Sequence, residues 1–104
     1  MAPTLVNVIY PAAASADFNM DYYLGTHMPL VQKNWGPHGL QSWNVALLDK
    51  ETSGYHVQCV LVFETAEGFK AAMSSDTEIM PDVANFTATQ PSIWIGAVTG
   101  QWSA

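Results

Sequence analysis

The segment from Tyr55 to Phe63 constrains the fold of this chain more than any other feature. Its odd positions are all apolar, whereas its even positions mix polar and apolar side chains: His56, Gln58, Val60 and Val62. A period of two residues is typical of a β-strand, whose side chains point alternately to the two faces of a sheet. Because both faces carry apolar residues, we expect this strand to lie in a sheet that is covered on both sides.

Three further segments have the composition of β-strands: residues 5–10, 40–48 and 92–98. The first stops at Pro11, which cannot donate a hydrogen bond to a neighbouring strand. Residues 49–54 are polar and form the turn between the second strand and the segment 55–63.

The connection after the first strand predicts a helix. Ser15 or Asp17 can cap its start, and two adjacent sides of the following residues are apolar or aromatic, so the helix packs closely. Gly25 and Pro29 are expected to weaken or kink it, because proline removes a helical hydrogen bond. Residues 30–35 can form one or two more turns.

The connection before the last strand predicts a helix over residues 66–75, capped by Thr65, and a short helical turn around Pro81. The order of elements is therefore β-α-β-β-α-β in one domain, residues 1–104. This order is typical of the ferredoxin-like split βαβ arrangement, an α+β fold with a four-stranded antiparallel sheet and both helices on one face. Since the helices cover one face, we expect a second copy of the chain to cover the other, as a homodimer.

Composition excludes several classes of partner. Three Lys, no Arg and nine acidic residues give a net charge of −6, which argues against binding to nucleic acid or to an anionic membrane. No apolar run approaches the roughly 20 residues of a membrane span, and no basic segment precedes an apolar stretch as in a signal peptide. The single Cys59 forms no internal disulfide and fits a reducing compartment. We therefore expect a cytoplasmic protein.

Aromatic and sulfur-containing residues are abundant for so short a chain. Its 104 residues include four Trp, four Tyr, four Phe and five Met, while only 12% are charged. A domain of this size buries only about 60–70% of its unfolded surface. We therefore expect some of the aromatic surface to face a partner subunit, a ligand cavity, or both.

Residues 21–31 read Asp-Tyr-Tyr-Leu-Gly-Thr-His-Met-Pro-Leu-Val. This segment resembles the Tyr-Tyr, His-x-Pro-Leu signature of the EthD (ethyl tert-butyl ether degradation) family, which belongs to the dimeric α+β barrel superfamily. A weaker similarity lies in residues 80–86, Met-Pro-Asp-Val-Ala-Asn-Phe. The resemblance implies an apolar cavity within each subunit, between the helices and the sheet. Relatives in the superfamily resemble cofactor-independent monooxygenases, lactone isomerases, polyketide cyclases and dehydratases.

His27 is the leading candidate for a catalytic residue. It follows Tyr23 by four positions, so the two side chains can share one side of a helix. Histidine titrates near neutral pH, as general acid–base catalysis requires. The alternative is structural, with His27 bonding a carbonyl group that the helix interruption frees. The His-Met-Pro-Leu resemblance adds weight to the catalytic interpretation, in which Tyr23 assists.

Five residues are candidates for substrate binding: Asn7, Tyr10, Tyr22, Trp43 and Trp94. Tyrosine hydroxyls can donate hydrogen bonds to an oxyanion or a phenolic oxygen, and tryptophans on strands can form the wall of an aromatic cavity. Asn7 is polar within an apolar strand and needs a hydrogen-bonding partner. Core packing is the alternative for each aromatic residue. We expect His56 to lie at the dimer interface and His38 in a loop.

The chain has no Gly-rich dinucleotide loop, no phosphate loop, no cysteine pairs and no H-E-x-x-H zinc motif, so we expect no cofactor and no metal. Three hypotheses follow. The first is a cofactor-independent enzyme, a monooxygenase-like oxidoreductase or an isomerase or dehydratase, which moves a proton on an apolar aromatic or oxygenated molecule in a degradative or tailoring pathway. The second is a non-catalytic accessory or carrier protein that binds a hydrophobic compound. The third is a purely structural dimer.

Overall fold

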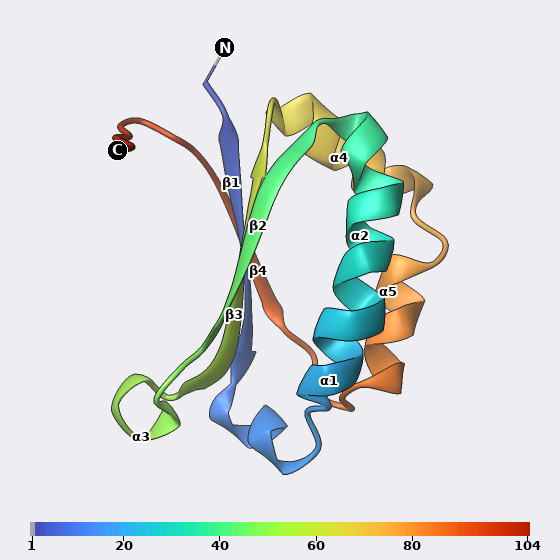
Figure 1. Cartoon of the computed structure of the whole chain (residues 1–104), viewed down its shortest axis with the longest axis vertical. Coiled ribbons are helices and arrows are strands. Elements are labelled where there is room, and N and C mark those ends of the chain that lie inside the picture. Colours follow the sequence, from blue (N-terminus) through green and yellow to red (C-terminus); the bar gives the residue numbers. More distant parts are fainter. Residues whose placement is uncertain (1) are drawn as a thin grey trace.

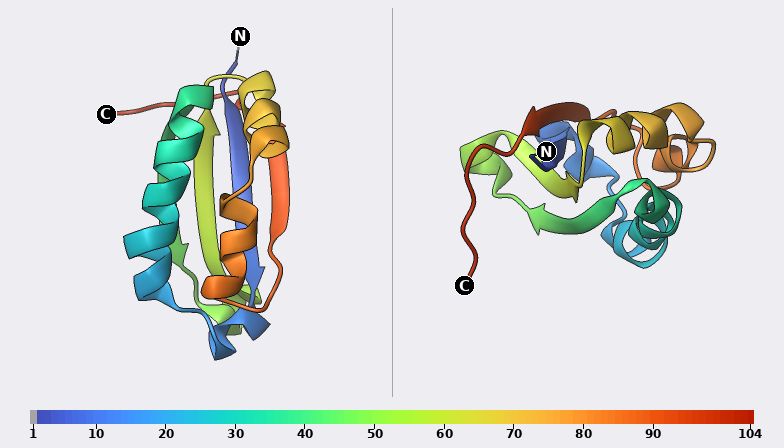
Figure 2. Two further views of the ribbon diagram at one scale, coloured as in Figure 1. Left: turned by 90° about the vertical axis from the view of Figure 1, so that its right-hand side faces the viewer. Right: turned by 90° about the horizontal axis from the view of Figure 1, so that it is seen from above.

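The protein is described by a computed structural model that covers residues 2–104. Its strands form one antiparallel sheet in the order β2-β3-β1-β4, and helices cover only one face of it (Figures 1 and 2). This is the ferredoxin-like fold that the order of elements predicts. The strands are β1 (Thr4–Pro11), β2 (Leu40–Leu47), β3 (Tyr55–Phe63) and β4 (Ser92–Ala97).

The strand register determines which side chains face the helices. Residues directly opposite each other in a sheet share a face, and Val6 lies opposite Leu61 on β3 and Ile95 on β4. The odd residues of β3, from Val57 to Phe63, are buried on this helix-covered face. The largest fully buried side chains are Tyr10, Tyr23, Phe63, Met28, Leu61, Val6, Val57 and Cys59.

The first helical region begins later than the sequence predicts. Residues 12–16 form a 3₁₀ turn, η1 (Ala12–Ala16), and the cap is Asn19, whose Oδ1 accepts a hydrogen bond of 3.0 Å from the Tyr22 amide. Ser15 and Asp17 do not cap this helix. The Asp17 carboxylate instead accepts hydrogen bonds from Thr87 Oγ1 (2.6 Å) and the Ala88 amide (2.8 Å), which ties the start of the helix to the segment before β4.

Gly25 and Pro29 do not end the helix. It runs through α1 (Met20–Tyr22), a π-helical turn η2 (Tyr23–His27) and α2 (Met28–Trp35). The Met28 amide donates to the Tyr23 carbonyl, five residues back, so the π turn holds one extra residue. Pro29 lies in the first turn of α2, where a proline is tolerated. A 3₁₀ turn, η3 (Gly36–His38), follows.

The second helical region carries α4 (Ala66–Ser75), α5 (Ile79–Asp82) and η4 (Val83–Asn85). Thr65 caps α4 as predicted, with its Oγ1 accepting from the Gly68 amide at 3.0 Å. The Asp76 carboxylate accepts from the amides that open α5, those of Glu78 (3.2 Å), Ile79 (2.9 Å) and Met80 (2.8 Å). The predicted polar turn contains a short helix, α3 (Lys50–Ser53).

The described residues, 2–104, include no helix long and apolar enough to cross a membrane.

Candidate active site

An apolar cavity of about 40 Å³ lies between the helices and the sheet. That volume holds roughly three water molecules. The side chains of Met28, Met73 and Met80 line the cavity. Methionine side chains are flexible, so they let the cavity adapt to a ligand. Its polar lining comes from Tyr10, Tyr23, His27 and Cys59.

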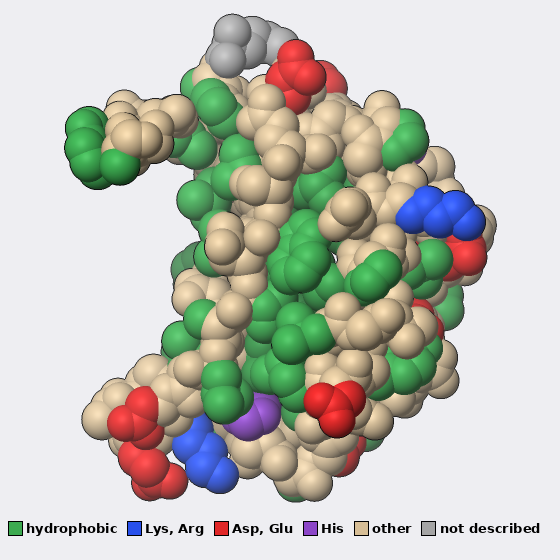
Figure 3. All heavy atoms as spheres, in the orientation of Figure 1, with side chains coloured by type: hydrophobic (Ala, Val, Ile, Leu, Met, Phe, Trp, Pro, Cys, Tyr) green, Lys and Arg blue, Asp and Glu red, His purple; other side chains and the backbone are tan. Residues whose placement is uncertain are grey.

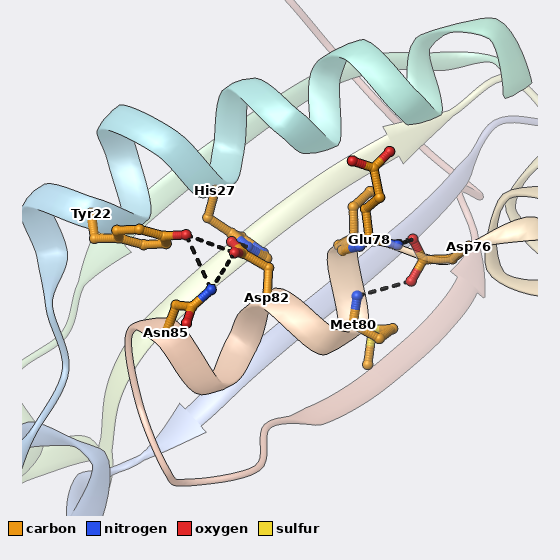
Figure 4. A network of polar contacts seen from close by, with 8 residues as sticks. Tyr22, His27, Asp76, Glu78, Met80, Asp82 and Asn85 are labelled. Atoms are coloured by element: carbon orange, nitrogen blue, oxygen red, sulfur yellow. Dashed lines mark hydrogen bonds and ion pairs between the residues drawn. The ribbon is translucent and has the colours of Figure 1, made fainter.

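The His27 imidazole is hydrogen-bonded to the Asp82 carboxylate at the end of this cavity. His27 Nδ1 lies 2.8 Å from Asp82 Oδ2, and the two side chains are 6% and 12% exposed (Figure 4). An ionised carboxylate only accepts hydrogen bonds, so the proton on the ring resides on Nδ1. The pairing therefore leaves Nε2 as the ring nitrogen available to a ligand.

The other carboxylate oxygen of Asp82 is held by two donors. The Tyr22 hydroxyl donates to Asp82 Oδ1 at 2.6 Å, and Asn85 Nδ2 donates to it at 2.8 Å (Figure 4). Burial opposes the ionisation of Asp82, but these two hydrogen bonds and the one from His27 hold the pKa of its carboxyl below its usual value. Asp82 is thus fixed in position and in its ionised form.

The π turn places Tyr23 against His27. The two rings are stacked, with centroids 5.4 Å apart and planes 14° from parallel. The Phe86 ring makes an edge-type contact with the imidazole, and the centroids of these two rings are 4.7 Å apart. Burial raises the pKa of both Tyr10 and Tyr23, so both hydroxyls stay protonated and can donate hydrogen bonds. Burial also raises the pKa of the Cys59 thiol to about 11, against a hydrogen bond from Tyr23.

The structure brings three of the predicted site residues together at the cavity: Tyr10, Tyr23 and His27. Tyr22 lies beside them but does not line the cavity. Its hydroxyl is used by Asp82, and this bond raises the pKa of the phenol. Tyr22 thus holds Asp82 in the structure, and the expectation that it binds substrate stays a prediction.

Asn7, Trp43 and Trp94 do not line the cavity, contrary to prediction. Asn7 alternates with the buried Val6 and so lies on the open face, where its Oδ1 accepts from Gln58 Nε2 at 3.0 Å. Trp94 is opposite Asn7 on the same face and is 64% exposed. Trp43 is on the helix-covered face but at the β2 edge, where its Nε1 donates to Gln32 Oε1 at 3.2 Å.

The two other histidines lie apart from the cavity. The register of β1 and β3 shifts beside His56, and the centroid of its ring lies 5.6 Å from that of Phe18. His56 thus packs against Phe18, and its expected position at the dimer interface stays a prediction. His38 lies in η3, with Nε2 at 3.5 Å from Ser75 Oγ.

Sequence reasoning did not single out Asp82 or Asn85. Both lie in residues 80–86, the segment whose weaker family resemblance was the one available signal. Their spacing of three residues places both side chains on one side of a helical turn, toward Tyr22. Within residues 2–104, His, Cys, Asp and Glu side chains form no group of three or more that could hold a metal ion.

Comparison with known proteins gives a family and a set of solved relatives. Residues 12–90 match the EthD domain family. The crystal structure of an EthD-like protein from Ralstonia eutropha JMP134 is 30% identical and has a TM-score of 0.85, with 99% of this chain and 97% of that chain covered. No curated protein matches the chain.

Two more distant structures share the fold alone. A dimeric ferredoxin-like protein from an uncultured marine organism is 10% identical, covers 96% of each chain and has a TM-score of 0.65. A mutant of SnoaB, a cofactor-independent oxygenase from Streptomyces nogalater, is 10% identical over 95% of this chain and 94% of that chain, with a TM-score of 0.59.

Proposed function

The chain belongs to the EthD domain family, and from this premise we propose that it is a small enzyme that uses His27 to move a proton on an apolar, oxygenated molecule. The observation that carries the proposal is the His27–Asp82 pair at the wall of a mostly apolar cavity. A buried histidine with one nitrogen fixed by a carboxylate and the other free is the arrangement of a general base.

The proposed step is the removal of a proton from a carbon or hydroxyl group of the substrate. His27 Nε2 takes the proton, and the electron pair of the broken bond moves onto a substrate oxygen. Asp82 lies 2.8 Å from Nδ1 and offsets the charge of the imidazolium that forms. The neutral hydroxyl of Tyr23 or Tyr10 can donate a hydrogen bond to the oxyanion.

This step is common to several outcomes. Return of the proton to another carbon gives an isomerisation, and loss of a neighbouring hydroxyl group with that proton, as water, gives a dehydration. Reaction of the carbanion with dioxygen, as co-substrate, gives an oxidation without a cofactor. SnoaB, a cofactor-independent oxygenase, supports the third outcome through its fold alone.

The side chains that line the cavity favour a neutral substrate over a charged one. Among the described residues no Lys lines the cavity, so a carboxylate or phosphate on the substrate would lose its hydration with no lysine to pair with. At about 40 Å³ the cavity is smaller than the roughly 150 Å³ of a cavity that binds benzene, so even a substrate with one aromatic ring requires the methionine side chains to move. We infer an aromatic or oxygenated apolar compound of a degradative or tailoring pathway.

A carrier function is the alternative, and the predominance of apolar side chains in the cavity favours it. A carrier would bind the same class of compound but would need no base. The two functions differ in what His27 does, because a carrier keeps its ligand when His27 loses its basic nitrogen.

We also propose a cytoplasmic homodimer. The open face of the sheet has the apolar side chains of Leu5, Val60 and Trp94, and the dimeric ferredoxin-like relative supports a second copy as its cover. The single Cys59, which is a buried free thiol, supports a reducing compartment.

The test of the catalytic proposal is hydrogen–deuterium exchange of the methyl protons of acetophenone in D₂O, followed by proton NMR. Acetophenone is an apolar one-ring ketone with an acidic C–H bond. We expect the protein to accelerate exchange, His27→Gln to abolish the acceleration, and the control His38→Gln to retain it. Acetophenone binding without acceleration would contradict the enzyme and support the carrier.

A further inference from the structure

The open face of the sheet has no charged side chain among the residues that the structure describes. The strand register places twelve residues on this face, and none of them is buried. They are Leu5, Asn7, Ile9, Ser42, Asn44, Ala46, Gln58, Val60, Val62, Ser92, Trp94 and Gly96. The chain has a net charge of −6, yet this face carries none of it. The face therefore fits an uncharged protein surface better than a basic partner, which acidic side chains would attract.

The C-terminal segment, residues 98–104, follows β4 and extends away from the sheet on the side of its open face. The Val98 amide donates to the Pro3 carbonyl at 2.9 Å, and residues 99–104 then extend away from the sheet on its open side (Figures 1 and 2). Trp102 in this segment is 86% exposed, the highest value among the large apolar side chains of residues 2–104. A tryptophan in this setting is typical of a residue that is buried by a partner.

The segment and the turn that contains α3 project at opposite ends of the open face. Figure 3 shows the hollow between these projections, with apolar and uncharged side chains inside it and charged side chains at its lower end. The open face is therefore a concave surface with the C-terminal segment at one rim.

We propose that residues 98–104 of each copy bind the second copy of the chain that packs on the open face, with Trp102 buried against that copy. The inference rests on the proposed homodimer. Two sheets that pack face to face are about 10 Å apart, whereas seven extended residues span roughly 23 Å. The segment is thus long enough to pass the interface and to reach the side of the partner's sheet.

A second copy fits this segment better than other occupants do. Residues 98–104 carry no charged side chain, as the open face carries none, so the two surfaces meet without burying a charge. Under twofold symmetry the segment of each copy packs against the other copy, so both Trp102 side chains are buried in one dimer. The direction of the segment, away from its own sheet, is the geometry that such an exchange requires.

The experiment uses the full chain labelled with 5-fluorotryptophan and observed by fluorine NMR. Four resonances are expected, and the Trp102→Phe variant identifies that of Trp102. The readout is the change of its chemical shift between H₂O and D₂O, which reports exposure to solvent. A monomeric reference comes from Val60→Lys, or from Asn44→Lys on the same face if the first variant does not fold.

We expect the Trp102 resonance to be protected from solvent in the wild-type dimer and exposed in the monomeric reference. We also expect Trp102→Ala to raise the dimer dissociation constant about tenfold or more, while the control Gln101→Ala changes it little. Protection of Trp102 in both dimer and monomer would show that the segment folds onto its own sheet. Exposure of Trp102 in both would show that the segment binds nothing. Either result overturns the inference.

The mass of the wild-type protein by light scattering separates this inference from the homodimer on which it rests. A monomer would overturn both. A dimer with an exposed Trp102 would overturn only the role of the segment and would leave the sheet-to-sheet dimer in place.

Discussion

Asp82 Oδ2 lies 2.8 Å from His27 Nδ1, although 55 positions separate the two residues in the chain. The contact joins η2, the π turn between α1 and α2, to α5 on the helix-covered side of the sheet (Figure 4). Because the cavity lies beneath these two elements, the hydrogen bond both fixes the imidazole and holds part of the cavity wall in place.

Asp82→Asn should reduce activity while the protein stays folded. The amide side chain can donate to Nδ1, which favours the tautomer with its proton on Nε2 and removes the base from the cavity. We expect the rate of acetophenone exchange to fall by about 10²-fold or more. The milder change Asn85→Ala removes one of two donors to Oδ1 and should cost less activity. Equal rates for Asp82→Asn and wild type would contradict this role.

The stability of the protein should fall in acid because of Asp17 and Asp82. Hydrogen bonds to Thr87 and Ala88 hold the pKa of the Asp17 carboxyl below its usual value, and the pKa of Asp82 is also lowered. A carboxyl with a lowered pKa stabilises the folded state above its unfolded pKa, and this contribution is lost as the pH falls.

We therefore expect the free energy of unfolding in urea to decrease as the pH falls below about 4. Asp17→Asn and Asp82→Asn should each make this decrease shallower, and only Asp82→Asn should also affect activity. A pH dependence unchanged in both variants would show that these two carboxyls do not contribute.

Much of the fold could be predicted because its signals are local. The alternation of residues 55–63 indicated the bounds of β3, and Thr65 marks the start of α4. The glycine and proline in the first helix are local signals of a weakened or kinked helix, but they do not show that a hydrogen bond spanning five residues lets the helix continue.

The site could be predicted only in part, because it combines distant segments. The helical spacing of Tyr23 and His27 indicated their proximity, whereas Asp82 meets His27 only through the tertiary fold. Residue parity could have excluded Asn7, because Tyr10 lies an odd number of positions away on the same strand and faces the cavity.

Gly68→Ala should destabilise the protein, because a Cβ at this position would lie 2.2 Å from the carbonyl oxygen of His38. The close approach of α4 to η3 thus requires glycine, and we expect a loss of about 2 kcal/mol or more in the free energy of unfolding. Gly25→Ala is the matched control, because nothing lies within 4 Å of the added Cβ. It should stabilise the helix by about 0.5–1 kcal/mol. Equal effects of the two variants would contradict the close contact.

Met80→Trp should block the entrance of the cavity. Met80 and Ile93 line the cavity and are 36% and 39% exposed, so we expect the entrance beside them, where a larger ring can be placed without entering the core. We expect acetophenone binding, measured by calorimetry, to weaken about tenfold or more, while the control Met80→Leu binds as the wild type does. Unchanged binding in Met80→Trp would place the entrance elsewhere.

The protonation of the His27 ring tests the central claim most directly and needs no substrate. Nitrogen-15 NMR of the imidazole at mildly alkaline pH, where an ordinary histidine is neutral, reports which nitrogen carries the proton. We predict a proton on Nδ1 and an unprotonated Nε2 in the wild type, and a change of tautomer in Asp82→Asn. A wild-type ring with its proton on Nε2 would contradict the account, because the cavity would then face a donor and not a base.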